Sequence, residues 1–160
     1  MGSKTNEIIT GTYNYKGDSI IYGDTDSVYF TAFPSLTKEI ESGEINWNND
    51  SAIILYDQIA DAVNDSFPEY MKESHNVLEE RGLIIKAGRE LVASKGLFIT
   101  KKRYAVLIYD LEGNRLDING YSGKVKAMGL DLKRSDTPAF MQEFLNEILL
   151  DLLNLSLIHI

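Results

Sequence analysis

The sequence predicts an α+β fold, in which helices and antiparallel strands occupy separate stretches of one chain. Apolar strand-forming residues flank a short acidic turn within residues 20–30, and several strand-like segments follow one another over residues 82–127. Apolar residues recur at helical spacing over residues 53–71 and 140–153. The 160 residues, 44% of them hydrophobic, suffice for one domain or slightly more with an apolar core.

The beginning of the chain is expected to contain a helix end, a hairpin and a loop. Residues 5–12 have the pattern of a helix end, and a glycine-containing loop then leads to a strand at about Ser19–Tyr22. Its partner strand is expected at about Ser27–Ala32. Gly, Asn and Pro become frequent from Phe33 to Asp50, which predicts a variable loop.

The next segment predicts a helix that flanks the hairpin. Its apolar positions are Ile53, Tyr56, Ile59, Ala60, Val63, Phe67 and Met71. Pro68 lies inside this stripe, and because proline removes a helical hydrogen bond we expect it to kink or interrupt the helix. The stripe is expected to pack in a core and not to form a functional surface.

A small β-subdomain is expected around residues 82–127, followed by a last helix. Short strands are predicted near Gly82–Ala87, Glu90–Ala93, Gly96–Thr100 and Tyr104–Asp110. Glu112-Gly113-Asn114 predicts a hairpin turn, with Arg115–Ile118 as the returning strand. Thr137 as N-cap and Pro138 at the first helical position predict the start of the last helix. Its expected core stripe is Phe140, Met141, Phe144, Leu145, Ile148, Leu149, Leu152 and Leu153.

The composition excludes some classes of site and leaves others open. There is no cysteine, so disulfides and thiolate metal sites are excluded, and a cytoplasmic location is expected. No apolar run reaches the ~18 residues of a membrane span. The formal charge of −8 disfavours nucleic-acid binding by the whole surface. Two local segments are nevertheless cationic, Lys95–Arg103 and Lys124–Arg134.

Asp24 and Asp26 lie one residue apart in the predicted hairpin turn. Residues i and i+2 of an extended chain share a face, so both carboxylates can point to one place if the turn stays nearly extended. Such a pair repels unless a cation lies between them, and Mg²⁺ prefers oxygen ligands completed by substrate phosphates. The residues therefore suggest metal-dependent phosphoryl transfer. For a bare Asp-x-Asp, a plain acidic hairpin turn is the commoner explanation. A calcium loop does not fit, because Val28 and Tyr29 fall where it needs a ligand and a glycine.

Three short motifs carry a resemblance to a known family. Tyr22-Gly23-Asp24-Thr25-Asp26-Ser27 resembles motif C of family B DNA polymerases, and Lys101-Lys102-Arg103-Tyr104-Ala105 resembles their Lys-x-Tyr motif. Met128-Gly129-Leu130, followed by Lys133-Arg134-Ser135-Asp136-Thr137-Pro138, resembles the segment that leads into the first thumb helix. The spacer Ala93-Ser94-Lys95-Gly96 is most similar to the T-even-type phage branch.

The resemblance implies a division of the chain. Residues 1–127 would be the C-terminal part of the palm, residues 128–154 the start of the thumb, and residues 155–160 a non-native tail. The tail, Leu155-Ser156-Leu157-Ile158-His159-Ile160, is similar to a translated sequencing adapter, and as a chain end it would expose apolar surface. The motif A aspartate and the fingers lysine of the family would precede Met1.

The resemblance also implies a function and the residues that perform it. The parent enzyme would be a template-directed DNA polymerase, in which the primer 3′-oxygen attacks the α-phosphate of a deoxynucleoside triphosphate. Asp24 and Asp26 would be catalytic and would hold Mg²⁺ in a two-metal site with half of its ligands present. Tyr22, Gly23, Thr25 and Ser27 would shape the turn. The chain alone would then be inactive.

Lys102 and Tyr104 are expected to bind primer–template DNA, with Lys101 and Arg103 as supporting cations. Strand alternation would place Lys102 and Tyr104 on one face, where they could reach the base-edge acceptors of the minor groove. The alternative from the residues alone is a basic strand that keeps a sheet edge soluble.

A second function of a different class stays open. The chain could be a non-catalytic DNA-binding or interaction subunit of a split polymerase, with an upstream polymerase half as its partner. The residues do not separate such a subunit from a truncated reading frame.

Overall fold

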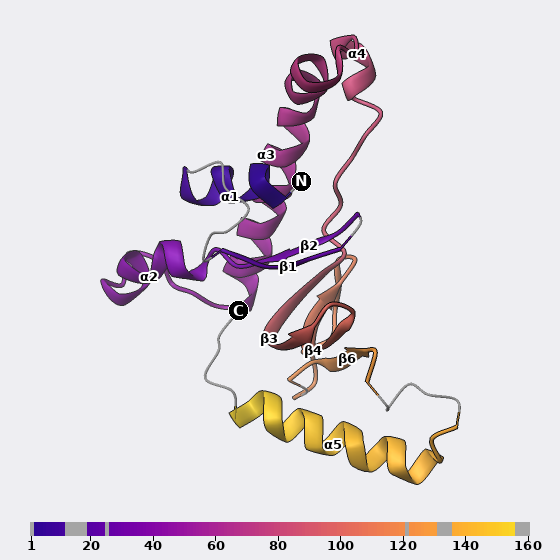
Figure 1. Cartoon of the computed structure of the whole chain (residues 1–160). Coiled ribbons are helices and arrows are strands. Elements are labelled where there is room, and N and C mark those ends of the chain that lie inside the picture. The colour runs from indigo at the N-terminus through magenta and orange to yellow at the C-terminus, as the bar shows by residue number, and fades with distance from the viewer. Residues whose placement is uncertain (1, 12–18, 25, 121, 131–135, 156–160) are drawn as a thin grey trace. The chain divides into compact units, whose positions relative to one another are not determined.

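The protein is described by a computed structural model that covers residues 2–11, 19–24, 26–120, 122–130 and 136–155 (Figure 1). These residues form helices and strands in the order α1 (Gly2–Thr10), β1 (Ile20–Gly23), β2 (Val28–Phe30), α2 (Phe33–Glu41), α3 (Asn49–His75), α4 (Glu79–Gly82), β3 (Leu91–Thr100), β4 (Arg103–Leu111), β5 (Asn114–Arg115), β6 (Lys124–Met128) and α5 (Ala139–Leu155). The strands form a two-stranded and a four-stranded sheet, and the predicted α+β class is confirmed.

The chain divides into two compact units. The first, here called the helical unit, comprises residues 1–20 and 34–89. The second, here called the sheet unit, comprises residues 21–33 and 90–160. Within the residues described by the structure, no helix is both long and apolar enough to cross a membrane.

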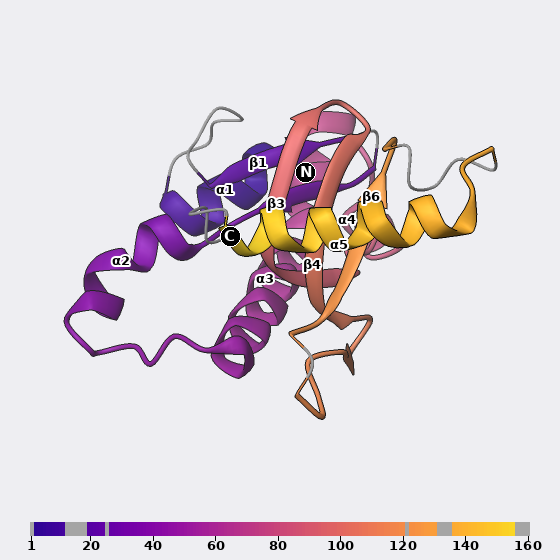
Figure 2. The same cartoon turned by 90° about the horizontal axis from the view of Figure 1, so that it is seen from below.

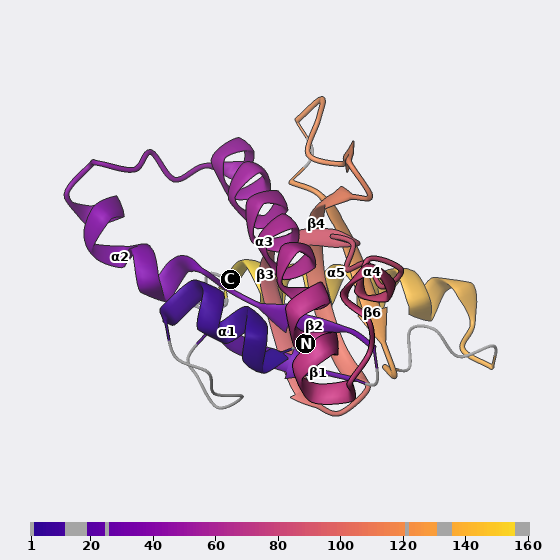
Figure 3. The ribbon, with the colours of Figure 1, turned by 90° about the horizontal axis from the view of Figure 1, so that it is seen from above.

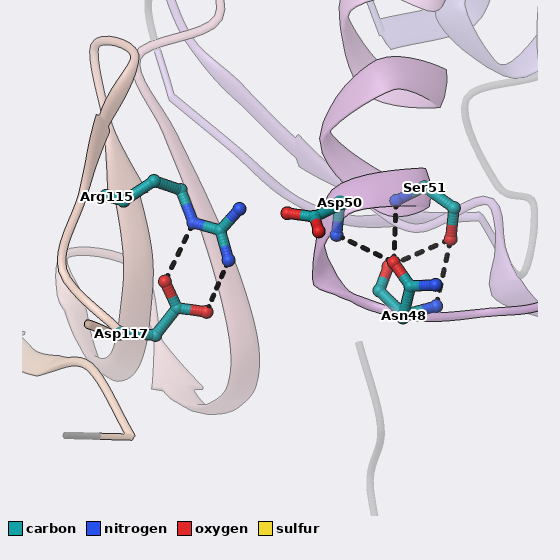
Figure 4. Close-up of polar contacts among 5 residues, drawn as sticks. All are labelled: Asn48, Asp50, Ser51, Arg115 and Asp117. Atoms are coloured by element: carbon teal, nitrogen blue, oxygen red, sulfur yellow. Dashed lines mark hydrogen bonds and ion pairs between the residues drawn. The ribbon is translucent and has the colours of Figure 1, made fainter. Parts of the chain in front are cut away.

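The helical unit is built on α3, against which α1 and α4 pack (Figure 3). The buried side chains of α3 are Ala52, Tyr56, Ile59, Val63 and Phe67, so the predicted stripe is confirmed in its central positions. Asn48 caps the helix: its side-chain oxygen accepts hydrogen bonds from the backbone N–H groups of Asp50 and Ser51, at 2.9 and 3.0 Å (Figure 4). The Ser51 hydroxyl accepts from the Asn48 backbone N–H in return, which completes a capping box.

Pro68 does not interrupt α3, so that part of the sequence prediction is wrong. The helix runs from Asn49 to His75 with Pro68 inside it. Tertiary contacts stabilise this region: the Asn64 side chain exchanges two hydrogen bonds with the Ala87 backbone. Gly82 lies so close that a Cβ atom there would be 2.5 Å from the Pro68 Cα atom. Packing on both sides of the proline offsets the lost helical hydrogen bond.

Two further predictions in the helical unit are wrong. Phe33–Glu41 is the helix α2, where a loop was expected. The Thr31 hydroxyl accepts a hydrogen bond from the Phe33 N–H, and Pro34 in the first turn supplies a backbone angle suited to a helix. The expected strand at Gly82–Ala87 does not form: Gly82 ends α4, and among the described residues no strand pairs with residues 83–87, where a lone strand would be unstable.

The sheet unit is organised around β4, whose residues 104–110 are all buried. β4 pairs antiparallel with β3 on one side and with β5 and β6 on the other. The two strands predicted at Glu90–Ala93 and Gly96–Thr100 are one strand, β3, with register irregularities between Val92 and Lys95. Helix α5 crosses this sheet, with contacts to β3, β4 and β6 (Figure 2).

The hairpin after β4 has the expected turn. Glu112 and Gly113 have φ angles of 50° and 82°, as in the tight turns that suit the twist of a hairpin. The returning strand β5 is shorter than expected, Asn114–Arg115. Arg115, its last residue, forms an ion pair with Asp117, with 2.7 Å between Arg115 Nη2 and Asp117 Oδ2 (Figure 4).

Helix α5 begins one residue later than predicted and buries less than predicted. It starts at Ala139, and the Pro138 carbonyl accepts hydrogen bonds from the N–H groups of Met141 and Gln142, so Pro138 holds the N-cap position that was expected for Thr137. Only Leu149 and Leu153 of the expected core stripe are buried, while Phe140 and Phe144 are 69% and 56% exposed. The prediction that the whole stripe forms core is therefore wrong: the helix contacts the sheet along one side only.

Some predictions concern residues outside the described ranges. These are Thr25, the segment Lys133-Arg134-Ser135, and the tail after Leu155.

Candidate active site

The acidic turn connects β1 and β2 in the sheet unit. The Asp24 backbone N–H donates a hydrogen bond of 3.0 Å to the Ser27 carbonyl, which closes a tight turn. The Asp24 side chain is 19% exposed, whereas Asp26 is exposed. The two carboxylates thus have different surroundings.

The lysine turn, Lys101-Lys102, connects β3 to β4. Lys102 has a φ angle of 61°, in the left-handed region that few non-glycine residues adopt. Because Lys102 lies in a turn and not in a strand, the predicted alternation of Lys102 and Tyr104 on one strand face is wrong. Tyr104 is only 4% exposed and lies in the core of the sheet unit, whereas Lys101, Lys102 and Arg103 are exposed.

The two turns meet at Asp24. The Lys101 Nζ atom lies 3.8 Å from Asp24 Oδ1, and the Lys102 Nζ atom lies 3.9 Å from Asp24 Oδ2. Both lysine side chains are largely exposed, so these ion pairs contribute little to stability. Their importance is geometric, because they place two exposed cations beside one largely buried carboxylate.

Tyr22 connects the same two turns through its hydroxyl group. The hydroxyl oxygen accepts a 2.9 Å hydrogen bond from the Lys102 backbone N–H. The hydroxyl donates a longer hydrogen bond, 3.5 Å, to Asp24 Oδ2. A tyrosine hydroxyl can donate and accept at once, so one atom links the acidic turn to the lysine turn.

An aromatic cluster of Tyr22, Tyr29, Phe98 and Tyr104 lies beneath the site. Its ring centroids are between 5.2 Å (Tyr29–Tyr104) and 6.0 Å (Tyr22–Tyr29) apart. The Tyr29 hydroxyl donates a hydrogen bond of 3.0 Å to the Tyr104 hydroxyl. Burial first, and this hydrogen bond second, raise the pKa of Tyr29 above its ordinary value of 10.0, so it stays neutral at working pH. Each such ring pair adds about 0.5–1.5 kcal/mol to stability.

Gly129 brings the third motif to the lysine turn. The backbone pairing of β4 with β6 aligns Tyr104 with Met128, one residue before Gly129. Gly129 has a φ angle of 65°, and a Cβ atom there would lie 2.1 Å from the Lys102 carbonyl oxygen. Only glycine fits this close approach. The segments of all three motifs therefore meet around the lysine turn.

Reasoning from the sequence missed two parts of this site. Phe98 and Tyr29 were not singled out, and Tyr22 was assigned only to the shape of its turn.

Across the described parts of the chain, no group of three or more His, Cys, Asp or Glu side chains could hold a metal ion.

The described residues thus form an α+β fold in which the acidic turn between β1 and β2 contacts the lysine turn between β3 and β4. The chain is similar to the DNA-directed DNA polymerase of Escherichia phage RB69, with 32% identity over 155 residues, 90% of this chain and 16% of that protein. It is also similar to the DNA-directed DNA polymerase of Enterobacteria phage T4, with 27% identity over 138 residues, 81% of this chain and 15% of that protein. No family model matches the chain.

The chain is thus related to a segment of the DNA-directed DNA polymerases of T4-like phages, and the predicted similarity to phage polymerases of this branch is confirmed. It spans only 16% and 15% of the length of these two relatives.

Proposed function

We propose that this chain carries part of the polymerising site of a template-directed DNA polymerase. Such an enzyme transfers a nucleotidyl group from a deoxynucleoside triphosphate to the primer 3′-oxygen. The observation that carries the proposal is the contact of Asp24 with the lysine turn, because it joins an acid that can bind metal to cations that can bind DNA. The similarity to phage polymerases supports the same conclusion.

In this proposal Asp24 is the main carboxylate ligand of Mg²⁺, and Asp26 is a nearby acid that assists. The donor chemistry fits: a carboxylate that already attracts two ammonium groups offers hard oxygen atoms to a divalent cation. Bound Mg²⁺ would stabilise the negative charge that develops on the phosphate oxygens. The described residues supply too few ligands for two ions, so the remaining ligands would come from another part of a polymerase.

The exposed cations Lys101, Lys102 and Arg103 would bind primer–template DNA. The ammonium groups of Lys101 and Lys102 are almost equally close to Asp24. Lys102 is in addition held by the hydrogen bond from its backbone N–H to the Tyr22 hydroxyl. Tyr104 would serve DNA binding indirectly, because its side chain is buried and packs under the turn. Residues 1–127 would belong to the palm and residues 128–154 to the thumb, and the protein would act in the cytoplasm of a host cell.

The second candidate is a non-catalytic DNA-binding subunit of a split polymerase. The small share of the relatives' length that the chain spans is compatible with this role. Co-expression with an upstream polymerase half separates the two: restored nucleotide incorporation favours a catalytic assembly, and DNA binding without incorporation favours the subunit.

The experiment that tests the main proposal is a chimera. The matching segment of the RB69 enzyme is replaced by this chain, and primer extension is measured for Asp24→Asn and for the control Asp61→Asn. Asp61 is an exposed acid of α3. We expect Asp24→Asn to lower the extension rate by at least about a hundredfold, since it removes a metal ligand, and Asp61→Asn to leave it unchanged. An Asp24→Asn chimera as fast as the parent chimera would contradict the proposal.

A further inference from the structure

We propose that Tyr22 is a positioning residue that fixes the lysine turn relative to Asp24, and so determines where the Lys102 ammonium group meets DNA. The DNA part of this inference rests on the proposed function. The positional part rests only on the hydrogen bonds of the Tyr22 hydroxyl with Lys102 and Asp24.

The conformation of Lys102 is the first reason. A lysine in the left-handed region is strained, and strain of this kind persists only where neighbouring groups hold the residue. The Lys102 peptide groups are held from two directions. Its N–H is bound by the Tyr22 hydroxyl at 2.9 Å, and its carbonyl oxygen packs closely against Gly129. Of these contacts, the hydroxyl is the one that can be removed without changing the shape of the core.

The position of the Tyr22 ring is the second reason. The ring is stacked on Phe98, with 5.8 Å between centroids, and tilted against Tyr104 at 5.7 Å. Phe98 and Tyr104 come from the two strands that the lysine turn connects, and they are aligned in register. The ring packing therefore fixes the position of the Tyr22 hydroxyl, and the hydroxyl holds the Lys102 backbone N–H in place through its hydrogen bond.

Tyr29 provides a matched control. It belongs to the same cluster and also carries a hydroxyl, but this hydroxyl bonds to Tyr104 and not to either turn. A substitution to Phe removes one hydroxyl and keeps the ring at both positions. Any effect of Tyr22→Phe that Tyr29→Phe does not reproduce is therefore due to the contacts of the Tyr22 hydroxyl with Lys102 and Asp24.

The first measurement is amide hydrogen exchange of Lys102 in the ¹⁵N-labelled 160-residue chain. We expect exchange at Lys102 to become about two- to tenfold faster in Tyr22→Phe, the scale of one lost hydrogen bond, and to stay unchanged in Tyr29→Phe. Unchanged exchange at Lys102 in Tyr22→Phe, or equal acceleration in both variants, would overturn the inference whether or not the chain binds DNA.

The second measurement is the affinity of the same chain for a primer–template duplex at low salt. We expect Tyr22→Phe to weaken binding about two- to tenfold, and to have no further effect when Lys102 is already replaced in Lys102→Ala. A merely structural role would give additive losses, and additive losses would overturn the inference. If the unsubstituted chain does not bind DNA, this result counts against the proposed function. The hydrogen-exchange measurement alone then tests whether Tyr22 holds Lys102 in place.

Discussion

The start of α3 and the candidate site are both held by side-chain hydrogen bonds to backbone groups, but they differ in the sequence distance that these bonds span. At the helix start, Asn48 bonds to residues two and three positions away. At the site, Tyr22 bonds to Lys102, 80 positions away. The first arrangement forms whenever the local segment becomes helical. The second exists only after two hairpins of the sheet unit have packed together, so the site is a product of tertiary structure and is more easily lost.

The largest expected effect comes from adding a methyl group where the third motif meets the lysine turn. Gly129→Ala places a Cβ atom 2.1 Å from the Lys102 carbonyl oxygen, and the backbone must shift. We expect a loss of about 2–4 kcal/mol in the free energy of unfolding, measured by urea denaturation.

Gly113→Ala is the control for Gly129→Ala. Gly113 has a similar φ angle, 82°, but open space around the position of a Cβ atom. Its substitution should cost only the backbone strain, about 1 kcal/mol. Equal losses for the two variants would show that Gly129 is needed for its backbone angle alone and that the close contact is unimportant.

Substitution in the Asn48 cap of α3 should lower the free energy of unfolding less than Gly129→Ala does. Asn48→Ala removes the side-chain acceptor of the α3 cap, and we expect a loss of about 1 kcal/mol in the free energy of unfolding. Asn48→Asp retains the acceptor and should be nearly neutral. The site should be unaffected, so exchange at the Lys102 amide is the second readout. A change at Lys102 in Asn48→Ala would contradict the independence of the two arrangements.

The smallest effect concerns pH. The folded pKa of Tyr29 is raised above its ordinary value of 10.0, so the folded chain keeps a proton that the unfolded chain releases. The stability from this group is complete below pH 10.0 and is lost as the pH rises above it. Because Tyr29 is only partly buried, the slope should be a fraction of ~1.4 kcal/mol per pH unit. Thermal unfolding from pH 9 to 11 should be less pH-dependent in Tyr29→Phe, and an unchanged slope would contradict the role of Tyr29.

Local signals in the sequence were sufficient for much of the fold. The start of α5 to within one residue, the central stripe of α3 and the hairpin turn at Gly113 all depend on neighbouring residues and were predicted. The helix α2 was not predicted, because Thr31 and Pro34 start a helix in a segment whose composition is typical of a loop. The strand expected at residues 82–87 was predicted wrongly, because the composition of a segment does not reveal whether a neighbouring strand will pair with it.

The site was predicted in its parts and not in its assembly. Asp24 and Lys102 were identified separately from motif resemblance. Their contact depends on the register of β3 and β4, in which an irregularity between Phe98 and Thr100 brings Phe98 opposite Tyr104. A regular hairpin around Lys101-Lys102 would place Ile99 there instead. The aromatic cluster that supports Tyr22, and thus the link between the turns, could not be predicted without this irregularity.

The central claim is that Asp24 and the lysine turn form one site for a primer end. The most direct measurement is the affinity of the polymerase chimera for primer–template DNA in Lys102→Ala, compared with Lys124→Ala, which removes an exposed lysine of β6. We expect a loss of about 1–3 kcal/mol in binding free energy for Lys102→Ala, similar for every primer-terminal base pair, and a much smaller loss for Lys124→Ala. Equal losses for the two variants, or a loss at Lys102 confined to one terminal base pair, would contradict it.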